Sequence, residues 1–459
     1  EPILADWKTA VAERFHDSQD FMYKRMRRGG EHIELLLVKT TVDWQSVHEN
    51  LILPFYDRNI AEYYEDYAAS LPKRAQASTL AELLEKIADG HVLLDTGRSI
   101  LLFDFRAQPQ QEVREATVET VIQGPLNSFS EDLDRNVTLL RLRCYLPSIT
   151  VDRMTAGSRS KTHIAMVYDS DKADPAVLSE LKRRVERIRM PVVQAIGQLA
   201  LLLGDSNHGL FPRLLVTERP DRAALNLSQG KVIVLMDGTP FALTAPTTLF
   251  DFFSSMEDIY QNYIISRFLM ILRYFAVFVC LTLPAAYVAV TAYNPEVLRV
   301  ELALSIAGNR FAVPYPAFLE VFVMMVAMEL LVEASIRLPK AIGSAATTVG
   351  GLILGQAATE AGLVSSIMVI IVATVAISNF VVPINAMSFA IRVAKYGLLA
   401  SATLFGFLGL ALGFATLIGY LTTIESFGQP FLKLFENDDR QVKPTQMLIG
   451  KGQSPEDAQ

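Results

Sequence analysis

Residues 264–424 of this 459-residue chain are strongly apolar, and charged side chains are scarce among them. Within this region, Tyr274–Tyr293 and Tyr396–Tyr420 are uncharged runs with a tyrosine at each end. A helix needs about 20 apolar residues to cross a bilayer core ~30 Å thick, and tyrosines favour its interfaces. A soluble core helix seldom stays uncharged for so long. The sequence therefore predicts a polytopic α-helical membrane domain over 264–424.

Three further apolar stretches lie between these runs: Phe311–Ile336, Ala341–Thr359 and Ala361–Ile391. They bring the expected number of spans to about four or five. The last stretch contains residues that weaken a continuous helix and predict a break, namely Asn379, Pro383 and Asn385.

Basic residues near the ends of the runs predict the orientation, because Lys and Arg stay on the cytoplasmic side. Arg267 and Arg273 precede the first run, which makes the large N-terminal region cytoplasmic. Arg392 and Lys395 precede the last run. If residues 341–391 cross twice, this pair lies inside and the polar tail ends outside. If they cross once, the tail ends inside, and the sequence leaves both outcomes open.

Ionisable side chains inside the apolar region each need an explanation, because they are costly there. Glu329, Glu333 and Arg337 recur every four residues and share one helical stripe. Glu333 and Arg337 form either a simple ion pair or a functional one, and Glu329 has no evident partner. Glu360 is either a loop residue or an ion-path carboxylate. Glu320, near the outer face, is expected to be hydrated.

The stretch Ala341–Thr359 and the residues just after it are rich in small side chains, among them Gly343, Gly350, Gly351, Gly355 and Gly362. Small side chains let helix backbones approach closely. Two interpretations follow: ordinary helix packing within the chain, or a helix that faces a pore or a neighbouring subunit.

The soluble half contains an internal duplication. His32–Val38 is echoed by His163–Asp169, and Gly90–Phe103 by Gly230–Leu243, in the same order. Each copy reads as a strand, a helical stretch and a hairpin, which predicts two related α/β subdomains. The expected organisation is subdomain 1 (1–116), a linker (117–150), subdomain 2 (151–262), the membrane domain (264–424) and a polar tail (425–459).

Two short polar blocks are candidates for a catalytic loop or a contact site. Asp237-Gly238 lies between two β-rich runs and is a favoured hairpin tip, because both residues tolerate positive φ. Thr96-Gly97 holds the same place in the first copy, so the hairpin interpretation is preferred to a catalytic loop. The second block, "TERPD", contains Glu218, Arg219, Pro220 and Asp221. It is expected to be an ion-paired turn, with a contact site as the alternative.

Several function classes are disfavoured. The net charge of −7 argues against a nucleic-acid partner. The histidines show no metal-ligand spacing, and Cys144 and Cys280 build neither a metal site nor an expected disulfide. No Walker-type loop, G-x-S-x-G motif or basic-then-apolar leader is present. We therefore expect no catalytic, cofactor-binding or metal residues, and a non-enzymatic chain anchored by its later segments.

Three segments resemble the A subunit of GerA-type spore germinant receptors: "LFPRLLVTERPDRAALNLSQGKVIVLMDGTPFAL", "FFSSMEDIY" and "RLPKAIGSAATTVGGLILGQAATEAGLVSS". Gln123–Arg143 is similar to the family's segment between its two N-terminal subdomains, and the resemblance spans about residues 30–425. Departures occur at Leu126-Asn127, at Arg213 and in "EASIRLP".

The resemblance implies a multi-pass subunit in the inner membrane of the endospore, with the soluble region on the core side. It also implies a transporter-like B subunit and a lipoprotein C subunit as partners. Such A subunits transmit nutrient binding, by oligomerising into an ion channel. On that basis we treat Glu329, Glu333 and Glu360 as candidate pore residues. Gly350, Gly351, Gly355 and Gly362 are then candidate packing positions around the pore.

Two other classes remain as alternatives. A secondary transporter would account for uneven spans and broken, Gly- and Pro-bearing segments. It is disfavoured because the membrane half shows no internal repeat. A membrane-anchored enzyme is disfavoured because no convergent catalytic set is present.

Overall fold

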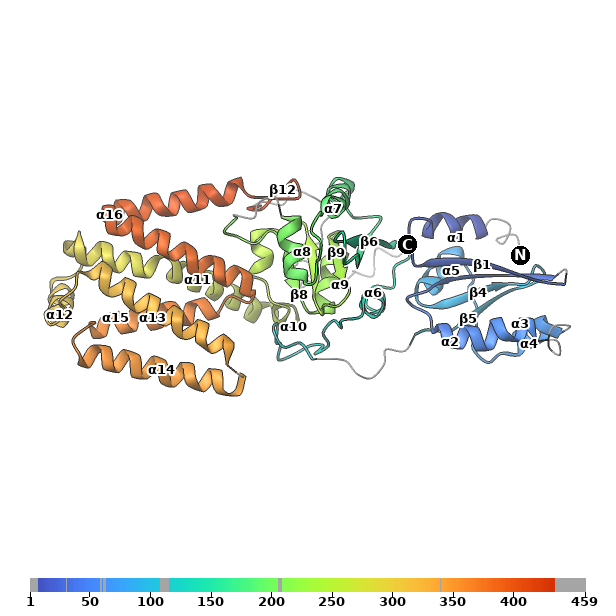
Figure 1. The fold of residues 1–459 in the computed structure, drawn as a ribbon, viewed down its shortest axis with the longest axis horizontal. Helices are drawn as coiled ribbons and strands as arrows, with labels where there is room; N and C mark the ends of the chain where they lie inside the picture. The colour runs from blue at the N-terminus through green and yellow to red at the C-terminus, as the bar shows by residue number, and fades with distance from the viewer. Residues whose placement is uncertain are drawn as a thin grey trace, which may run out of the picture.

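The computed structural model describes residues 7–433, except 30, 58–59, 61–62, 108–114, 205–208 and 339. Three regions follow one another along the long axis of the molecule (Figure 1). The second of two α/β subdomains lies between the first subdomain and a bundle of long helices. Most of the predicted polar tail, residues 434–459, lies outside the described residues.

The first subdomain is an antiparallel sheet with helices on both faces. Its strand order is β1-β2-β4-β5-β3, from β1 (Phe21–Arg28), β2 (Glu31–Val38), β3 (Arg74–Ala75), β4 (His91–Asp95) and β5 (Ile100–Asp104). Successive side chains of a strand point to opposite faces. Leu36 and Val38 therefore pack against α1 (Trp7–Phe15) and α5 (Leu80–Ala88). Leu35 and Leu37 pack against the other layer, which consists of α2 (Trp44–Val47), a π-helix (His48–Ile52), α3 (Leu53–Tyr56) and α4 (Tyr64–Ser70).

The second subdomain repeats this arrangement, with the strand order β6-β7-β9-β10-β8. The strands are β6 (Ile149–Ala156), β7 (Thr162–Asp169), β8 (Leu215–Thr217), β9 (Val232–Met236) and β10 (Ala242–Ala245). One face packs against α6 (Leu133–Arg141) and α9 (Pro220–Ser228), and the other against α7 (Pro175–Arg187) and α8 (Ile196–Leu203). The two strand orders match position for position, which confirms the predicted duplication.

Two local sequence signals have their expected structural result. Asp174 caps α7 by accepting a backbone N–H bond, and Pro175 follows in the first turn. Asp237-Gly238 joins β9 to β10, and the φ of Gly238 is 79°. At the equivalent turn between β4 and β5, the φ of Gly97 is 80°. The Asp-Gly pattern is therefore explained by backbone geometry.

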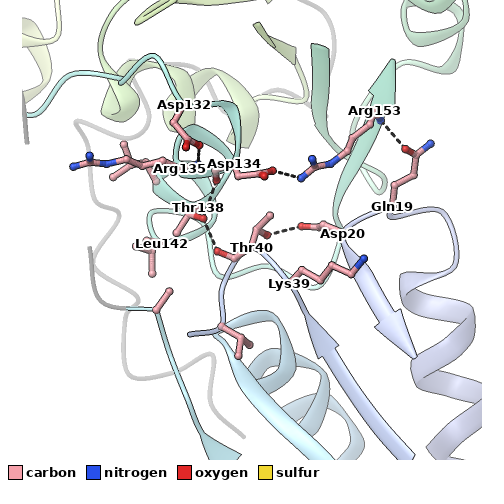
Figure 2. Close-up of a pocket in the computed structure, with 13 residues that line it drawn as sticks. Gln19, Asp20, Lys39, Thr40, Asp132, Asp134, Arg135, Thr138, Leu142 and Arg153 are labelled. Atoms are coloured by element: carbon pink, nitrogen blue, oxygen red, sulfur yellow. Dashed lines mark hydrogen bonds and ion pairs between the residues drawn. The ribbon is translucent and has the colours of Figure 1, made fainter. Parts of the chain in front are cut away.

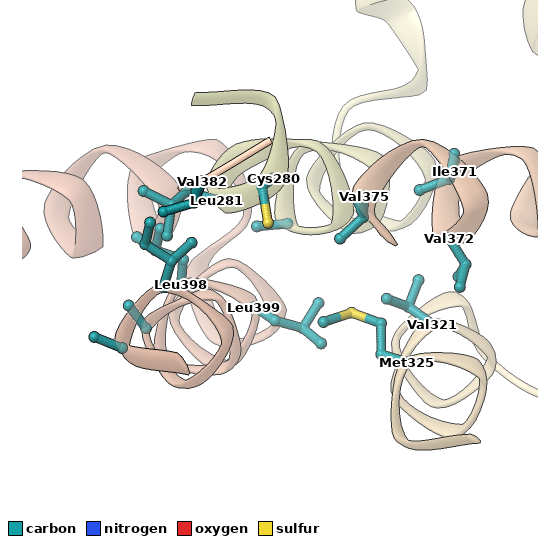
Figure 3. Packing of buried hydrophobic residues seen from close by; sticks show 14 of the residues in the cluster. Cys280, Leu281, Val321, Met325, Ile371, Val372, Val375, Val382, Leu398 and Leu399 are labelled. Carbon is teal, nitrogen blue, oxygen red and sulfur yellow. The ribbon is translucent and has the colours of Figure 1, made fainter. Parts of the chain in front are cut away.

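The third region is a helical bundle. Its helices are α11 (Tyr263–Ala292), α12 (Val300–Arg310), α13 (Ala317–Arg337), α14 (Lys340–Glu360), α15 (Ser366–Phe380) and α16 (Asn385–Thr423). Short helical turns flank α11, namely Leu249–Phe252, α10 (Glu257–Tyr260) and Pro295–Val297. We call the end of the bundle beside subdomain 2 the junction end and the opposite end the distal end (Figure 1). Residues of α11, α13, α15 and α16 meet in its core, among them Cys280, Met325, Val375 and Leu399 (Figure 3).

The last apolar part of the chain departs from the prediction. The break expected near Pro383 is confirmed, because it separates α15 from α16. The single span expected over Tyr396–Tyr420 is wrong, because the chain reverses direction inside α16 at Phe405 and Gly406. Gly406 has φ 58° and ψ −136°, a conformation that is strained for any residue with a side chain. The two legs of α16 fold back on each other (Figure 1).

The reversal returns the end of the chain to subdomain 2. There β11 (Glu425–Ser426) and β12 (Gln429–Pro430) form a small hairpin. Phe427 in its turn is part of the core of subdomain 2. α14 and α15 run in opposite directions between the junction end and the distal end. The reversal inside α16 was not predicted, and it brings the last described residues back to the junction end.

Two of the described helices, α11 and α16, are long and apolar enough to cross a membrane, and α15 is a shorter apolar helix. The length of α16 includes both legs of the reversal. The expected four or five spans are therefore not established by helix length and composition.

Gly406 generates the first prediction. A Cβ added at this residue would lie 2.9 Å from Cγ of Tyr293. Gly406→Ala is expected to lower the free energy of unfolding by about 1–3 kcal/mol, because it adds backbone strain and a clash. Thermal unfolding of the full chain in lipid nanodiscs measures the change. Gly419→Ala is the matched control, because a Cβ there meets no atom within 4 Å. An equal response of the two variants would contradict the assignment of the reversal to Gly406.

Candidate functional site: the junction between the soluble region and the bundle

The TERPD block lies where β8 ends and α9 begins, at the base of subdomain 2. Pro220 occupies the first turn of α9, where its missing N–H and fixed φ favour helix initiation. Arg219, at the cap position, is only 1% exposed. A guanidinium buried this deeply needs partners for all its donors.

Arg219 binds its own block and the linker at once. Its Nε lies 3.0 Å from Oδ1 of Asp221, and its Nη2 lies 2.6 Å from Oδ2. Its Nη1 and Nη2 also donate to the linker carbonyls of Glu119, at 3.1 Å, and Pro125, at 2.9 Å, respectively. Glu218 accepts backbone N–H bonds from Val118 and, at 2.8 Å, from Glu119. The block is thus an ion-paired turn, and it also fixes the linker between the two subdomains.

The start of α9 is also bound to the segment that enters the bundle. The Tyr260 hydroxyl donates to Oδ2 of Asp221 at 2.7 Å, and burial together with this bond raises the pKa of Tyr260 to about 12. Gly124 of the linker packs on the Tyr260 ring with a φ of +127°, and a Cβ there would lie 2.5 Å from the ring. Arg222 donates to the backbone oxygens of Asp251, at 2.8 Å, and Ser254, at 3.0 Å.

One further ion pair continues this series of contacts into the bundle. Arg273 of α11 is buried and lies 2.8 Å from Oδ2 of Asp258, and it also donates to the Phe253 carbonyl. In the sequence, Arg273 is recognisable only as an orientation signal. The structure gives it a second role, because it attaches the first long helix to the segment that α9 holds.

The hairpin tip docks onto the linker side of subdomain 2. The Gly238 N–H donates to the Glu131 carbonyl at 2.8 Å, and Asp237 accepts the Leu133 N–H at 3.3 Å. Asp237 therefore helps to hold the start of α6. No group of three or more His, Cys, Asp or Glu side chains among the described residues is arranged to hold a metal ion.

Another buried ion pair joins the two subdomains. Arg141 of α6 lies 2.7 Å from Oδ2 of Asp20 through its Nε and 2.8 Å from Oδ1 through its Nη2. Burial opposes ionisation of Asp20, but Arg141 outweighs it and holds the pKa of that carboxyl below its usual range, with help from Ser18 and Thr40. The Thr138 hydroxyl adds a bond to the Thr40 carbonyl. No sequence spacing connects Arg141 to Asp20, so sequence reasoning missed this pair.

A groove of about 640 Å³ runs beside this ion pair between the subdomains (Figure 2). Charged residues of both signs line it, and Arg153 and Asp134 pair across one wall. The Arg153 N–H donates to Oε1 of Gln19 at 3.0 Å. The bonds of Arg153 to Gln19 and of Thr138 to Thr40 hold the two subdomains together.

The three candidate pore carboxylates do not converge within one chain. Glu329 of α13 binds two cations of α16: its Oε1 lies 2.8 Å from Nζ of Lys395, and its Oε2 pairs with Arg392. Glu333 is exposed and lies 2.7 Å from Nη2 of Arg337, so the expected ion pair is present. Glu360 is exposed at the distal end of α14 and accepts a bond from Gln356 at 3.0 Å.

Glu320 corrects one expectation. It is 1% exposed, so the expected exposure to solvent is wrong. Its Oε1 accepts bonds from the N–H of Ser365, at 2.7 Å, and from its hydroxyl, at 2.6 Å. The carboxylate lies 3.3 Å from Nε of Arg310. Glu320 therefore links α12, α13 and the start of α15 at the distal end, where buried polar groups need such partners.

The glycines of α14 face different neighbours. A Cβ at Gly350 would lie 3.1 Å from Leu331 of α13, and one at Gly355 would lie 3.2 Å from Val369 of α15. These two positions pack inside the chain. A Cβ at Gly351 would meet nothing within 4 Å. Gly362 has a φ of +63° just after the helix and ends it.

The fold and the junction define a class of protein in which a duplicated α/β region is fixed, through one buried ion-paired block, to a bundle of apolar helices. A family model described as Bacillus/Clostridium GerA spore germination protein matches residues 9–449. The chain belongs to this family, as the TERPD and DGTPF motifs predicted.

Individual relatives agree with the family assignment. Spore germination protein KA of Bacillus subtilis (strain 168) is 33% identical over 94% of this chain and 81% of that protein. Spore germination protein GerLA of Bacillus cereus is 35% identical over 80% of this chain and 75% of that protein. These relatives are named as germination proteins and not as enzymes, in agreement with the non-enzymatic expectation.

One solved structure is also similar. It is the crystal structure of the N-terminal domain of the A subunit of the Bacillus megaterium spore germinant receptor GerK3. The match has a TM-score of 0.41 and 22% sequence identity, and it covers 53% of this chain and 94% of that one.

Removal of the Arg219 charge tests the junction. Arg219→Met is expected to lower the free energy of unfolding by about 3–5 kcal/mol, because Asp221 and two linker carbonyls lose a buried partner. Arg183→Met is the control: Arg183 pairs with Glu180 on the surface and is expected to change stability by less than about 1 kcal/mol. Chemical denaturation of the full chain in nanodiscs compares them. A small effect at Arg219 would show that the block does not hold the linker.

Removal of the Glu329 charge tests the cross-link between α13 and α16. Glu329→Gln leaves Arg392 and Lys395 without their shared counter-ion and is expected to cost about 3–5 kcal/mol. Glu333→Gln, on the same helical stripe, breaks only an exposed pair and is expected to cost less than about 1 kcal/mol. Thermal unfolding in nanodiscs distinguishes the two. Equal small shifts would mean that the Glu329 ion pairs do not stabilise the bundle.

Proposed function

We propose that this chain is the A-type subunit of a nutrient germinant receptor in the inner membrane of the endospore. Its non-enzymatic role is to transmit nutrient binding from the receptor to the start of germination. The observation that carries the proposal is its membership of the GerA family over nearly its whole length. The junction supports it, because buried contacts connect the linker, α9 and α11 in series.

The bundle crosses the membrane in this proposal, and the soluble region is cytoplasmic. Large apolar side chains that are more than half exposed on α11 and on both legs of α16 support a lipid-facing surface: Phe268, Ile271, Phe275, Leu404 and Leu408. Each long helix then crosses between the junction end and the distal end, and the hairpin after α16 returns to the cytoplasmic side.

Signal transmission in this proposal is a shift between two arrangements of the helices. Only contacts that differ between the two states can drive such a shift. A transporter-like B subunit and a lipoprotein C subunit are the proposed partners that bring the nutrient to the complex. Movement of α11 would reach the soluble region through Arg273 and Asp258.

An ion path would form between copies of the chain. Val349, Leu352 and Ile353 form an exposed apolar face on α14, and Gly351 leaves open space on the same helix for close approach of another backbone. Glu333 and Glu360 are exposed and can attract cations. The charge of Glu329 is compensated by two cations within the chain, so its proposed role in the path is indirect.

Spores that lack all other nutrient receptors test this function. One set expresses this chain with neighbouring B and C subunits, and a matched set lacks only this chain. We expect early ion release in response to a particular nutrient only in the complete set. Glu333→Gln and Glu360→Gln together are expected to reduce the release rate or change its cation preference. Release that does not depend on the chain would contradict the receptor role, and unchanged release in the double variant would remove the pore carboxylates alone.

A further inference from the structure

A small cavity of about 80 Å³ lies at the junction, between α9, the segment before α11 and the first turns of α11. Apolar side chains form part of its wall, including Leu225, Met256 and Met270. Polar side chains from both sides complete the wall, and two of them have distinctive hydrogen bonding: Asn226 of α9 and Ser266 of α11.

Asn226 and Ser266 are both deeply buried, with exposures of 5% and 0%. Nδ2 of Asn226 and Oγ of Ser266 have no hydrogen-bond partner among the residues that the structure describes. The orientation of the Asn226 amide is set by Lys231, whose Nζ donates to its Oδ1 at 3.3 Å. Nδ2 is therefore the free end of the amide. A buried amide or hydroxyl without a partner loses the hydrogen bonds that it makes with water in the unfolded chain, so two of them at one cavity call for an occupant.

Arg267, which also lines the cavity, is exposed and stacks on the Tyr263 ring. The buried charged groups there do not call for an ion, because each is already paired. Arg222 pairs with Glu119, Asp251 with Lys231, and Asp258 with Arg273. What remains is one amide donor and one hydroxyl that can donate or accept. A neutral molecule that both donates and accepts fits this set. The cavity exceeds the ~10–15 Å³ that one water requires.

We propose that this cavity is a water-binding site, and that a small cluster of bound water bridges Asn226 to Ser266. The bridge links the helix that carries the TERPD block to the first long helix of the bundle. Direct contacts fix the segment on either side of it: Arg222 donates to the carbonyls of Asp251 and Ser254, and Arg273 pairs with Asp258. A hydrogen bond through water is nearly as favourable as a direct one. The bridge therefore stabilises the junction, and it can rearrange without the loss of a direct bond between protein groups. The inference does not depend on the proposed receptor function.

Substitutions that remove one or both polar groups distinguish a hydrated cavity from a dry one. In a hydrated cavity, Ser266→Ala and Asn226→Leu each leave bound water with fewer partners. Each is expected to lower the unfolding midpoint of the full chain in nanodiscs by about 2–4 °C. The double variant N226L/S266A is expected to lose less than the sum, because it makes the cavity apolar. Asn226→Leu also removes the acceptor of Lys231, so the decisive variant is Ser266→Ala. In a dry cavity Ser266→Ala only removes an unpaired buried hydroxyl, so an unchanged or raised midpoint for this variant would overturn the proposal.

A second measurement needs no variant in the cavity. Radiolysis of bound water labels adjacent side chains, including buried ones, by oxidation. Met256 lines the cavity and is 5% exposed, whereas Met26 is 4% exposed in the core of subdomain 1. We expect Met256 in the intact chain to be oxidised severalfold faster than Met26. Equal rates would overturn the proposal.

Thr282→Ala serves as the folding control for Ser266→Ala, because it also removes a hydroxyl from α11. The Thr282 hydroxyl bonds to the Phe278 carbonyl of its own helix, at 2.7 Å.

Discussion

The junction depends on the ion pair and the hydrogen bonds that the buried guanidinium of Arg219 makes. A cation that is 1% exposed is tolerated only if every donor is satisfied. Its partners come from two places in the chain, Asp221 beside it and the linker carbonyls about a hundred residues earlier. Because Asp221 also binds Tyr260, one charge fixes the linker, subdomain 2 and the entrance to the bundle together.

A buried ion pair also lies at the other boundaries between regions of this protein. Arg141 and Asp20 join the two subdomains, and Arg273 and Asp258 attach α11 to the segment before it. Buried ion pairs contribute little net stability compared with apolar packing, but breaking one is costly. They therefore specify how regions are placed relative to one another, while the apolar cores supply most of the stability. A shift between helices would have to act against these pairs or through the more adaptable contacts beside them.

Inside the bundle, charged side chains form two clusters. Glu329, Arg392 and Lys395 cross-link α13 to α16, and Glu320 ties α13 to Arg310 and Ser365 at the distal end. Each carboxylate has a basic partner on another helix. This explains why such residues are accommodated among apolar helices, where an isolated charge would be costly. Among the described residues, the exposed carboxylates Glu333 and Glu360 have their partners within their own helices.

The sequence by itself determined the features that depend on local pattern. The duplicated α/β subdomains, the Asp237-Gly238 hairpin tip, the cap of α7 at Asp174 and the break near Pro383 all follow from periodicity, propensity or backbone geometry. Only the tertiary structure decided which charges meet, because Glu329 and Arg392, or Arg141 and Asp20, lie too far apart in the chain for spacing to relate them. It also decided the reversal at Gly406. The sequence around one glycine in an uncharged run does not distinguish a continuous helix from a helix that turns back, and in the folded chain Gly406 packs against Tyr293.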